Sequence, residues 1–181
     1  VRQFNVPVEP VEYKKKAPSG KSYCNRMLEE SGLTPADVQA KIFRKDTNNT
    51  TTVSKVFLSG TINSRNERVF DVGDDVIIEY YDLEGEPVKY EQVLNGKPTG
   101  KVKEYFRVRW QYPEEHLDKN GKPYKYKSPT GSGSFIYIPH RIREKYKAGE
   151  EIHRLFIQEG EKKAEKACKE KVDSVAISGI H

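Results

Sequence analysis

The pattern of hydrophobic and polar residues opens with a polar tail and two short helices. Residues 1–20 contain three prolines and the run KKKAPSG, which predicts an extended tail. Residues 21–31 predict a first helix. Thr34-Pro35, an N-cap residue followed by proline at the first helical position, predicts a second helix that runs to about residue 44. Residues 21–45 are therefore a predicted helical pair.

Residues 51–150 change to the pattern of strands. Apolar and polar residues alternate with a period of two, and VIIEYYDLEGEPVKYEQV predicts a hairpin around Leu83–Glu86. The alternation is clearest in KEYFRVRWQY, where Arg107 and Arg109 share one face and the apolar residues share the other. A short strand, FIYIP, and a helix from His140 to Lys147 follow.

Residues 151–181 change period again. IHRLFIQ predicts a buried strand, and SVAISGI predicts a second one. Between them, a helix from Glu161 to about Lys171 places Ala164, Ala167 and Cys168 on one side. A strand, a helix and a strand of these lengths predict parallel strands with a right-handed crossover. The whole chain is therefore expected to have an α+β fold, which ends in a small α/β unit.

The charge of the chain is unevenly distributed. Its 181 residues carry a formal net charge of +5. Residues 51–100 hold five Lys/Arg and nine Asp/Glu, whereas residues 101–150 hold 12 and six. A basic segment that also contains Tyr, Phe and Trp suits a polyanion with bases that can stack. The same charge can also belong to a merely solvated surface.

Two glycine-containing turns follow the strands of the predicted α/β unit. Glu159 and Gly160 come directly after the first strand, and Ser178 and Gly179 come after the second. Because the carboxyl ends of parallel strands form a ligand-binding edge, the Glu159 carboxylate can hold a divalent metal or act as a general base. It can equally cap the amides of the helix that starts beside it, and the residues alone leave both interpretations open.

Lysines and tyrosines interleave in KPYKYKSPTGSG, residues 122–133. Lys125 and Lys127 flank Tyr126, and Ser128 and a glycine-rich turn follow. Lysines pair with phosphates, tyrosines stack on bases, and the exposed amides of glycine turns bind anions. The composition fits a solvated hairpin loop equally well.

Several other kinds of site lack their sequence signals. The four histidines are scattered without an HExxH motif, and only His181, just beyond Ser178-Gly179, is placed to face the carboxyl edge. Cys24 and Cys168 belong to no CxxC pair. No apolar run approaches the roughly 20 residues that span a bilayer. We therefore expect a cytoplasmic protein with two reduced thiols and no membrane partner.

Three stretches follow one another along the chain: GKPYKYKSPTGSGSFIYIP, LFIQEGEKKAEKA and SVAISGIH. Together they resemble the junction in bacterial-type DNA primases between a basic β-rich subdomain and the Toprim domain. More closely, the chain resembles the primase-like, Toprim-containing proteins of plasmids, phages and conjugative elements. The resemblance covers roughly residues 76–181. Together with the residue pattern, it leads us to expect a tail at 1–20, a primase-like subdomain at 21–150 and a truncated Toprim βαβ unit at 151–181.

The resemblance implies roles for particular residues. Glu159 matches the Toprim glutamate, which acts with Mg²⁺ or Mn²⁺ in phosphoryl transfer, and Gly160 and Gly179 supply backbone turns. The implied contacts to template or nucleotide come from a basic strand and from the KYKS stretch: Arg107, Arg109, Lys125, Tyr126, Lys127 and Ser128. A helicase or another replication protein is a further implied partner.

The chain departs from the Toprim pattern, which also needs an Asp-x-Asp pair on a later strand. Glu159 is therefore expected to be part of a metal site whose remaining ligands lie beyond His181. We expect a piece of a longer protein that makes primers by Mg²⁺-dependent nucleotidyl transfer on a single-stranded DNA template, and we expect the piece alone to be inactive. The alternatives are a single-strand-binding module without catalysis, a Toprim nuclease, or a degenerate relative with a structural role.

Overall fold

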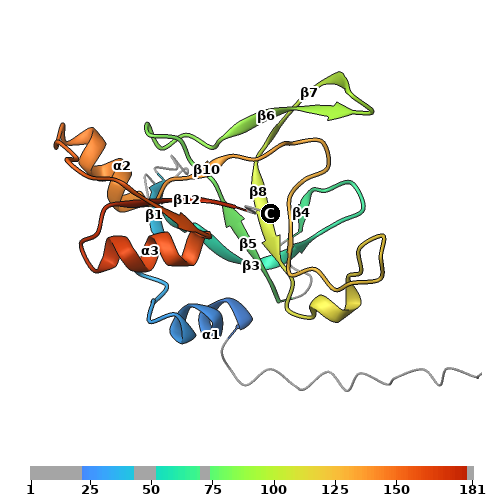
Figure 1. Cartoon of the computed structure of the whole chain (residues 1–181), viewed down its shortest axis with the longest axis horizontal. Helices are drawn as coiled ribbons and strands as arrows, with labels where there is room; N and C mark the ends of the chain where they lie inside the picture. Colours follow the sequence, from blue (N-terminus) through green and yellow to red (C-terminus); the bar gives the residue numbers. More distant parts are fainter. Residues whose placement is uncertain (1–21, 43–51, 70–73, 179–181) are drawn as a thin grey trace, which may run out of the picture.

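The computed structural model describes residues 22–42, 52–69 and 74–178, and the predicted tail at 1–20, Gly179 and His181 lie outside these ranges. It has the expected α+β fold (Figure 1). Its helices are α1 (Tyr23–Glu30), a 3₁₀ turn (Pro113–Glu115), α2 (His140–Lys147) and α3 (Glu161–Lys169). No helix among the described residues is both long and apolar enough to cross a membrane.

The larger sheet has five antiparallel strands in the order β4-β3-β5-β8-β9. Their bounds are β3 (Phe57–Ile62), β4 (Arg68–Val69), β5 (Asp75–Glu79), β8 (Phe106–Arg109) and β9 (Tyr126–Lys127). One face carries the buried cluster of Ile77, Phe106, Val108 and Trp110. The other face turns Arg107 and Arg109 towards the helices. The predicted alternation of this strand is therefore confirmed.

The smaller sheet has three strands in the order β10-β12-β11. β11 (Phe156–Glu159) and β12 (Ser174–Ile177) are parallel, and α3 connects them, as the sequence predicted. β10 (Ile136–Tyr137) pairs antiparallel with the other edge of β12. This sheet therefore joins a strand from before residue 150 to the βαβ unit that follows it.

One buried cluster joins the two sheets to helices α1 and α3. It includes residues of α1, β3, β5, β10, α3 and β12. Three tyrosines, Tyr80, Tyr105 and Tyr137, form its centre with edge-on ring contacts at centroid distances of 4.8 and 5.2 Å. The α/β unit is thus packed firmly against the larger sheet.

The second predicted helix is wrong. Residues 39–42 form strand β1 (Gln39–Ile42), which pairs antiparallel with β2 (Thr52–Lys55). Thr34 does begin a turn, since the Asp37 carboxylate accepts hydrogen bonds from its backbone N–H and hydroxyl at 2.7 and 2.8 Å. Lys169 and Arg141 also bind Asp37, and strand pairing then takes the place of further helix.

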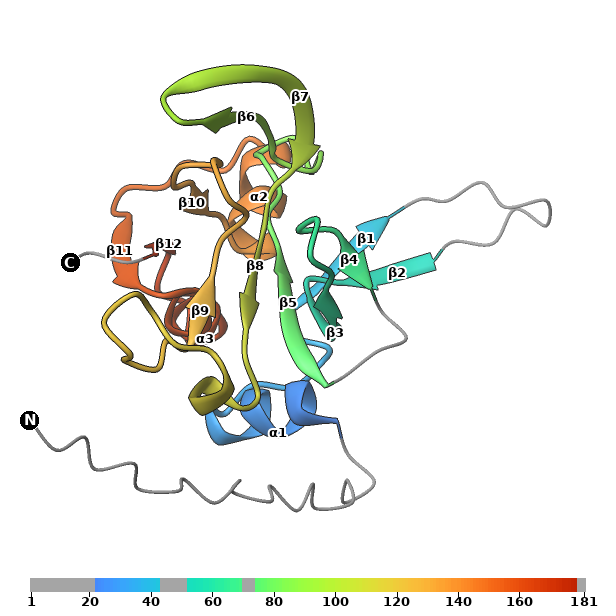
Figure 2. The ribbon, with the colours of Figure 1, turned by 90° about the vertical axis from the view of Figure 1, so that its right-hand side faces the viewer.

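The predicted hairpin around residues 83–86 is correct at its turn and wrong in its strands. The turn is closed by a bridge between Tyr81 and Pro87. Beyond it, β5 pairs with β3 and β8, whereas β6 (Lys89–Leu94) pairs with β7 (Lys97–Glu104), a strand that the sequence reasoning missed. The β6–β7 hairpin extends away from both sheets (Figures 1 and 2).

Strand β11 is not the buried strand that its apolar run predicted. It is an edge of the smaller sheet, and Phe156 and Ile157 are 43% and 63% exposed. Ala176 is buried on the face of the sheet that α3 covers. Ile157 aligns with the neighbouring Val175 and so lies on the opposite face. A run of apolar residues identifies a strand but not its neighbours.

Candidate nucleic-acid interface

The first turn of α3 is tied to the larger sheet by a buried carboxylate. Glu161 is 2% exposed and accepts hydrogen bonds from the Tyr80 hydroxyl and from Arg107 Nη1, both at 2.6 Å. Burial and the neighbouring Glu161 raise the pKa of Tyr80 far above its ordinary value. The phenol therefore stays protonated and donates the hydrogen bond to Glu161. This junction fixes the start of α3 beside β8.

Arg107 and Arg109 lie around the ring of Tyr126. Their guanidinium carbons are 4.7 and 5.4 Å from its centroid. Arg109 also donates from Nε to the Tyr23 hydroxyl at 3.1 Å and from Nη1 to the Tyr126 hydroxyl at 2.9 Å. The structure therefore brings together three of the predicted contact residues and adds Tyr23 from α1.

The lysines of the KYKS stretch are placed differently. Lys127 aligns with Val108, whereas Tyr126 aligns with Arg109, so Lys127 belongs to the opposite face of the sheet. Lys125 is exposed, and its carbonyl accepts the backbone N–H of Trp110. These two lysines are therefore not brought into the cluster of Arg107, Arg109 and Tyr126.

Ser128 lies at the boundary between the two sheets. Its hydroxyl is 3.1 Å from the hydroxyl of Tyr105. The hydroxyl of Ser178, at the end of β12, also neighbours that phenol. The KYKS stretch thus lies near the carboxyl edge of the parallel strands.

Glu159 lies at this carboxyl edge, where it ends β11 opposite Ile177. Its side chain is 66% exposed, and Lys163 is its ion-pair partner at 3.7 Å. Gly160 follows with a φ of 104°, a conformation that favours glycine. The glutamate is therefore accessible to solvent at the tip of its strand.

The expected metal site is not assembled in the part of the chain that the structure describes. Within it, no three His, Cys, Asp or Glu side chains are grouped to hold a metal ion. His181 lies outside the described residues, so its expected place at the carboxyl edge stays a prediction, as do the metal ligands expected beyond it. Glu159 alone does not make a magnesium site.

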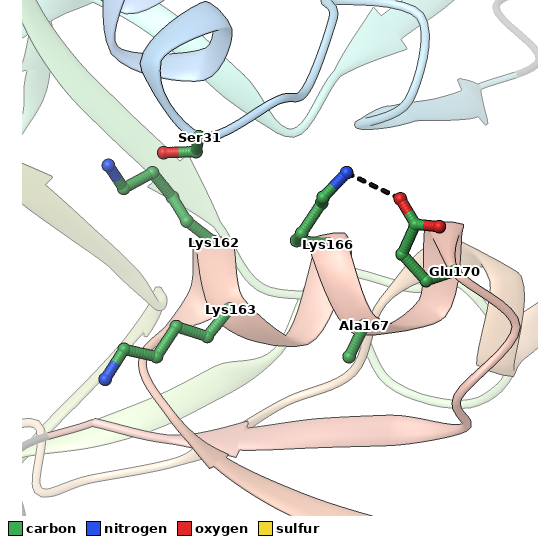
Figure 3. A pocket seen from close by; sticks show the side chains of 6 residues that line it. All are labelled: Ser31, Lys162, Lys163, Lys166, Ala167 and Glu170. Atoms are coloured by element: carbon green, nitrogen blue, oxygen red, sulfur yellow. Dashed lines mark hydrogen bonds and ion pairs between the residues drawn. The ribbon is translucent and has the colours of Figure 1, made fainter.

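Lys162 is a basic residue beside the arginine cluster that the sequence reasoning missed. Burial and the nearby guanidinium of Arg109 lower the pKa of its ammonium group. It lines a groove of about 470 Å³ between α1 and α3, together with Ser31, Lys163 and Lys166. Figure 3 shows the Lys162 side chain extending towards Ser31, whereas Lys163 points away from it.

A second buried carboxylate, Glu165, lies one turn further along α3. It accepts a hydrogen bond from the Tyr137 hydroxyl at 2.6 Å, and its other oxygen is 3.9 Å from His140 Nδ1. Burial raises the pKa of Glu165 to about 7. Burial and the neighbouring Arg141 lower the pKa of His140 to about 4. This pair lies away from Arg109 and belongs to the contact between α2 and α3.

One helical pattern could have revealed both buried glutamates. Glu161, Ala164, Glu165 and Cys168 have the i, i+3, i+4, i+7 spacing of one helix face, and all four are buried. The sequence reasoning assigned only the apolar members to the core.

No comparison with protein-family models, with curated proteins or with solved structures gave a match.

Proposed function

We propose that this chain binds single-stranded nucleic acid through β8, β9 and the start of α3, as part of a primase-like protein. The observation that carries the proposal is the cluster of Arg107, Arg109 and Tyr126 against the first turn of α3. Arg107 of this cluster binds Glu161, which is two residues from Glu159 at the carboxyl edge.

The chemistry of the cluster supports a polyanionic ligand. Arg109 donates to two neutral phenols, so its positive charge is not cancelled by those partners. Arginine and lysine beside a nucleic acid release counterions from the phosphates, which is the main source of affinity for single strands. The cluster is built on strands and a helix, so its geometry is fixed before a ligand arrives.

The wider proposal is nucleotidyl transfer on a DNA template by the longer protein. Glu159 is the residue proposed for this chemistry, because it is accessible at the carboxyl edge and because, among the described residues, its ion pair is a long one to Lys163. A buried or fully paired carboxylate would not be free to meet a substrate. Template-dependent nucleotide incorporation that is lost in Glu159→Gln, with DNA binding retained, would support this role.

Two alternatives predict different products. A binding module without catalysis retains DNA binding and gives no reaction in any form of the protein. A nuclease shortens DNA in the absence of nucleotides, and Glu159→Gln abolishes the cleavage. Gel analysis of the longer protein with labelled DNA, with and without nucleotides, separates the three.

The test of the binding proposal is fluorescence anisotropy of a labelled single-stranded oligonucleotide over a salt series. Each phosphate contact on a single strand contributes a slope of about −0.7 in log K against log salt. A wild-type slope of about −2 or steeper, shallower by about 0.7 in the Arg109→Ala variant, is expected. Lack of binding at low salt would contradict the proposal.

A further inference from the structure

Arg109 is held by two tyrosine hydroxyls where a buried arginine ordinarily meets a carboxylate. Its Nε and Nη1 donate to Tyr23 and Tyr126. Within the part of the chain that the structure describes, neither Arg109 nor Lys162 forms an ion pair with a carboxylate. The Arg109 guanidinium is therefore half-buried between two phenols, and Glu161 lies near one of them, Tyr126.

Both tyrosine hydroxyls still have a proton to donate. Each accepts a hydrogen bond from Arg109, and a phenol that accepts through its oxygen keeps its own O–H for an acceptor. The described residues supply no such acceptor to Tyr23 or Tyr126. The Tyr126 ring already has two guanidinium contacts, so the group it offers a ligand is its hydroxyl.

Lys162 adds a second cation to the same place. It follows Glu161, which Arg107 binds, and Arg107 is two residues from Arg109 on the same face of β8. Its side chain extends into the space between α3 and the end of α1 (Figure 3). Burial and then the nearby Arg109 guanidinium lower the pKa of the Lys162 ammonium, whereas the carboxylates of Glu30 and Glu161 act in the opposite direction.

Four elements thus contribute donors, namely a guanidinium, an ammonium and two phenol O–H groups, and the carboxylates near the ammonium are Glu30 and Glu161. Such a set is satisfied by one anion that has several oxygen acceptors. A tetrahedral phosphate presents oxygens in more directions than a planar carboxylate does, which matches donors that come from α1, β8, β9 and α3. We propose that Tyr23, Arg109, Tyr126 and Lys162 form a phosphate-binding site.

The phosphate has two possible sources. It belongs either to the backbone of a nucleic acid strand or to a free nucleotide or inorganic phosphate. Only the first source rests on the proposed function. The site differs from the contacts implied by the resemblance, because it includes Tyr23 and Lys162 and leaves out Lys125 and Lys127.

The experiment measures binding of three probes to the 181-residue chain: a labelled oligothymidylate, ATP without metal, and inorganic phosphate. The variants are Lys162→Gln and the double variant Tyr23→Phe/Tyr126→Phe. The control is Lys97→Gln, an exposed lysine of β7 that loses the same charge. Thermal unfolding of each variant establishes that it is folded.

The two variants are expected to differ in a diagnostic way. Lys162→Gln lowers affinity by at least about tenfold, because a charge-assisted hydrogen bond is lost. It also reduces the salt slope for the oligonucleotide by about 0.7. The phenylalanine variant weakens binding without changing the slope, because it removes donors and no charge. The Lys97→Gln control binds as the wild type does.

The outcomes separate this inference from the proposed function. Oligonucleotide binding that is unchanged in both variants overturns the phosphate site and leaves the proposed function standing. Binding of ATP or phosphate that both variants weaken, without binding of the oligonucleotide, supports the site and overturns the proposed function. No binding of any of the three probes by the wild type overturns both.

Discussion

Glu161→Gln is the substitution that most directly tests how the α/β unit is attached to the larger sheet. The wild-type carboxylate accepts from Tyr80 and from Arg107, both at 2.6 Å, with its side chain 2% and that of Arg107 12% exposed. Glutamine has the same shape, and its amide oxygen can still accept one of these hydrogen bonds. The variant therefore removes the negative charge and little else.

The size of the effect follows from the burial of Arg107. Removing one partner of a buried ion pair costs about 3–5 kcal/mol, because the other charge stays desolvated without compensation. The Arg107 guanidinium keeps some contact with solvent, so we expect the lower end, about 3 kcal/mol. Glu159→Gln is the matched control two residues away. Its ion pair with Lys163 is exposed, and its loss should cost less than about 0.5 kcal/mol.

Urea unfolding followed by tyrosine and tryptophan fluorescence measures both effects. With a slope of about 2 kcal/mol per molar urea, a loss of about 3 kcal/mol lowers the midpoint by about 1.5 M. The slope itself should not change. Midpoints for Glu161→Gln and Glu159→Gln that agree within about 0.2 M would refute the view that Glu161 and Arg107 hold α3 against β8.

Two further predictions concern the loop after β9 and the contact between α2 and α3. Gly131→Ala should destabilise the fold far more than Gly133→Ala: both glycines have positive φ, but an added Cβ at Gly131 would lie 2.1 Å from the Val93 carbonyl oxygen, whereas Gly133 has open space. Equal unfolding midpoints for these variants would contradict this placement. The pKa of Glu165 is raised to about 7, so this group contributes stability below about pH 4.5 that is lost as the pH rises through 7. The pKa of His140 is lowered to about 4, so this group contributes stability above about pH 6.5 that is lost as the pH falls through 4. As the pH is lowered from about 6.5 to 5, Glu165→Gln should therefore lose stability relative to the wild type, and His140→Gln should gain stability relative to it. Urea midpoints of the two variants that shift in the same direction relative to the wild type would contradict these two pKa shifts.

The sequence was most informative where one physical signal dominates. The alternation in KEYFRVRWQY predicted the two faces of β8. Successive side chains of a strand point to opposite faces, so the apolar residues share the face that packs into the core. The bounds of α2 at His140–Lys147 follow from a proline before the helix and Ala148-Gly149 after it. The βαβ unit was visible because its helix has a clear period between two apolar runs.

Long-range contacts explain what sequence reasoning did not find. Glu161 is buried because Tyr80 and Arg107, 81 and 54 residues away along the chain, satisfy it. The helical spacing could place Glu161 on the buried face of α3, but no local pattern identifies Tyr80 and Arg107 as its partners. Residues 39–42 likewise form a strand because β2 is available to pair with them, and pairing overrides a modest helical preference.

The placement of the candidate contacts depended on strand pairing. Lys127 and Tyr126 are neighbours in sequence, yet the register with β8 puts them on opposite faces of the sheet. The sequence could name both as basic or aromatic candidates but could not select which of them joins Arg109. Lys162 and Tyr23 come from helices whose positions are set by the buried cluster, and only the assembled fold brings them to Arg109.

The most direct test of the account is the salt dependence of single-stranded oligonucleotide binding by the wild-type chain and by Lys162→Gln. The account predicts a wild-type slope of about −2 or steeper in log K against log salt and a slope shallower by about 0.7 in the variant. Absence of binding by the wild type at low salt, or a slope near zero, would contradict a nucleic-acid function for this surface.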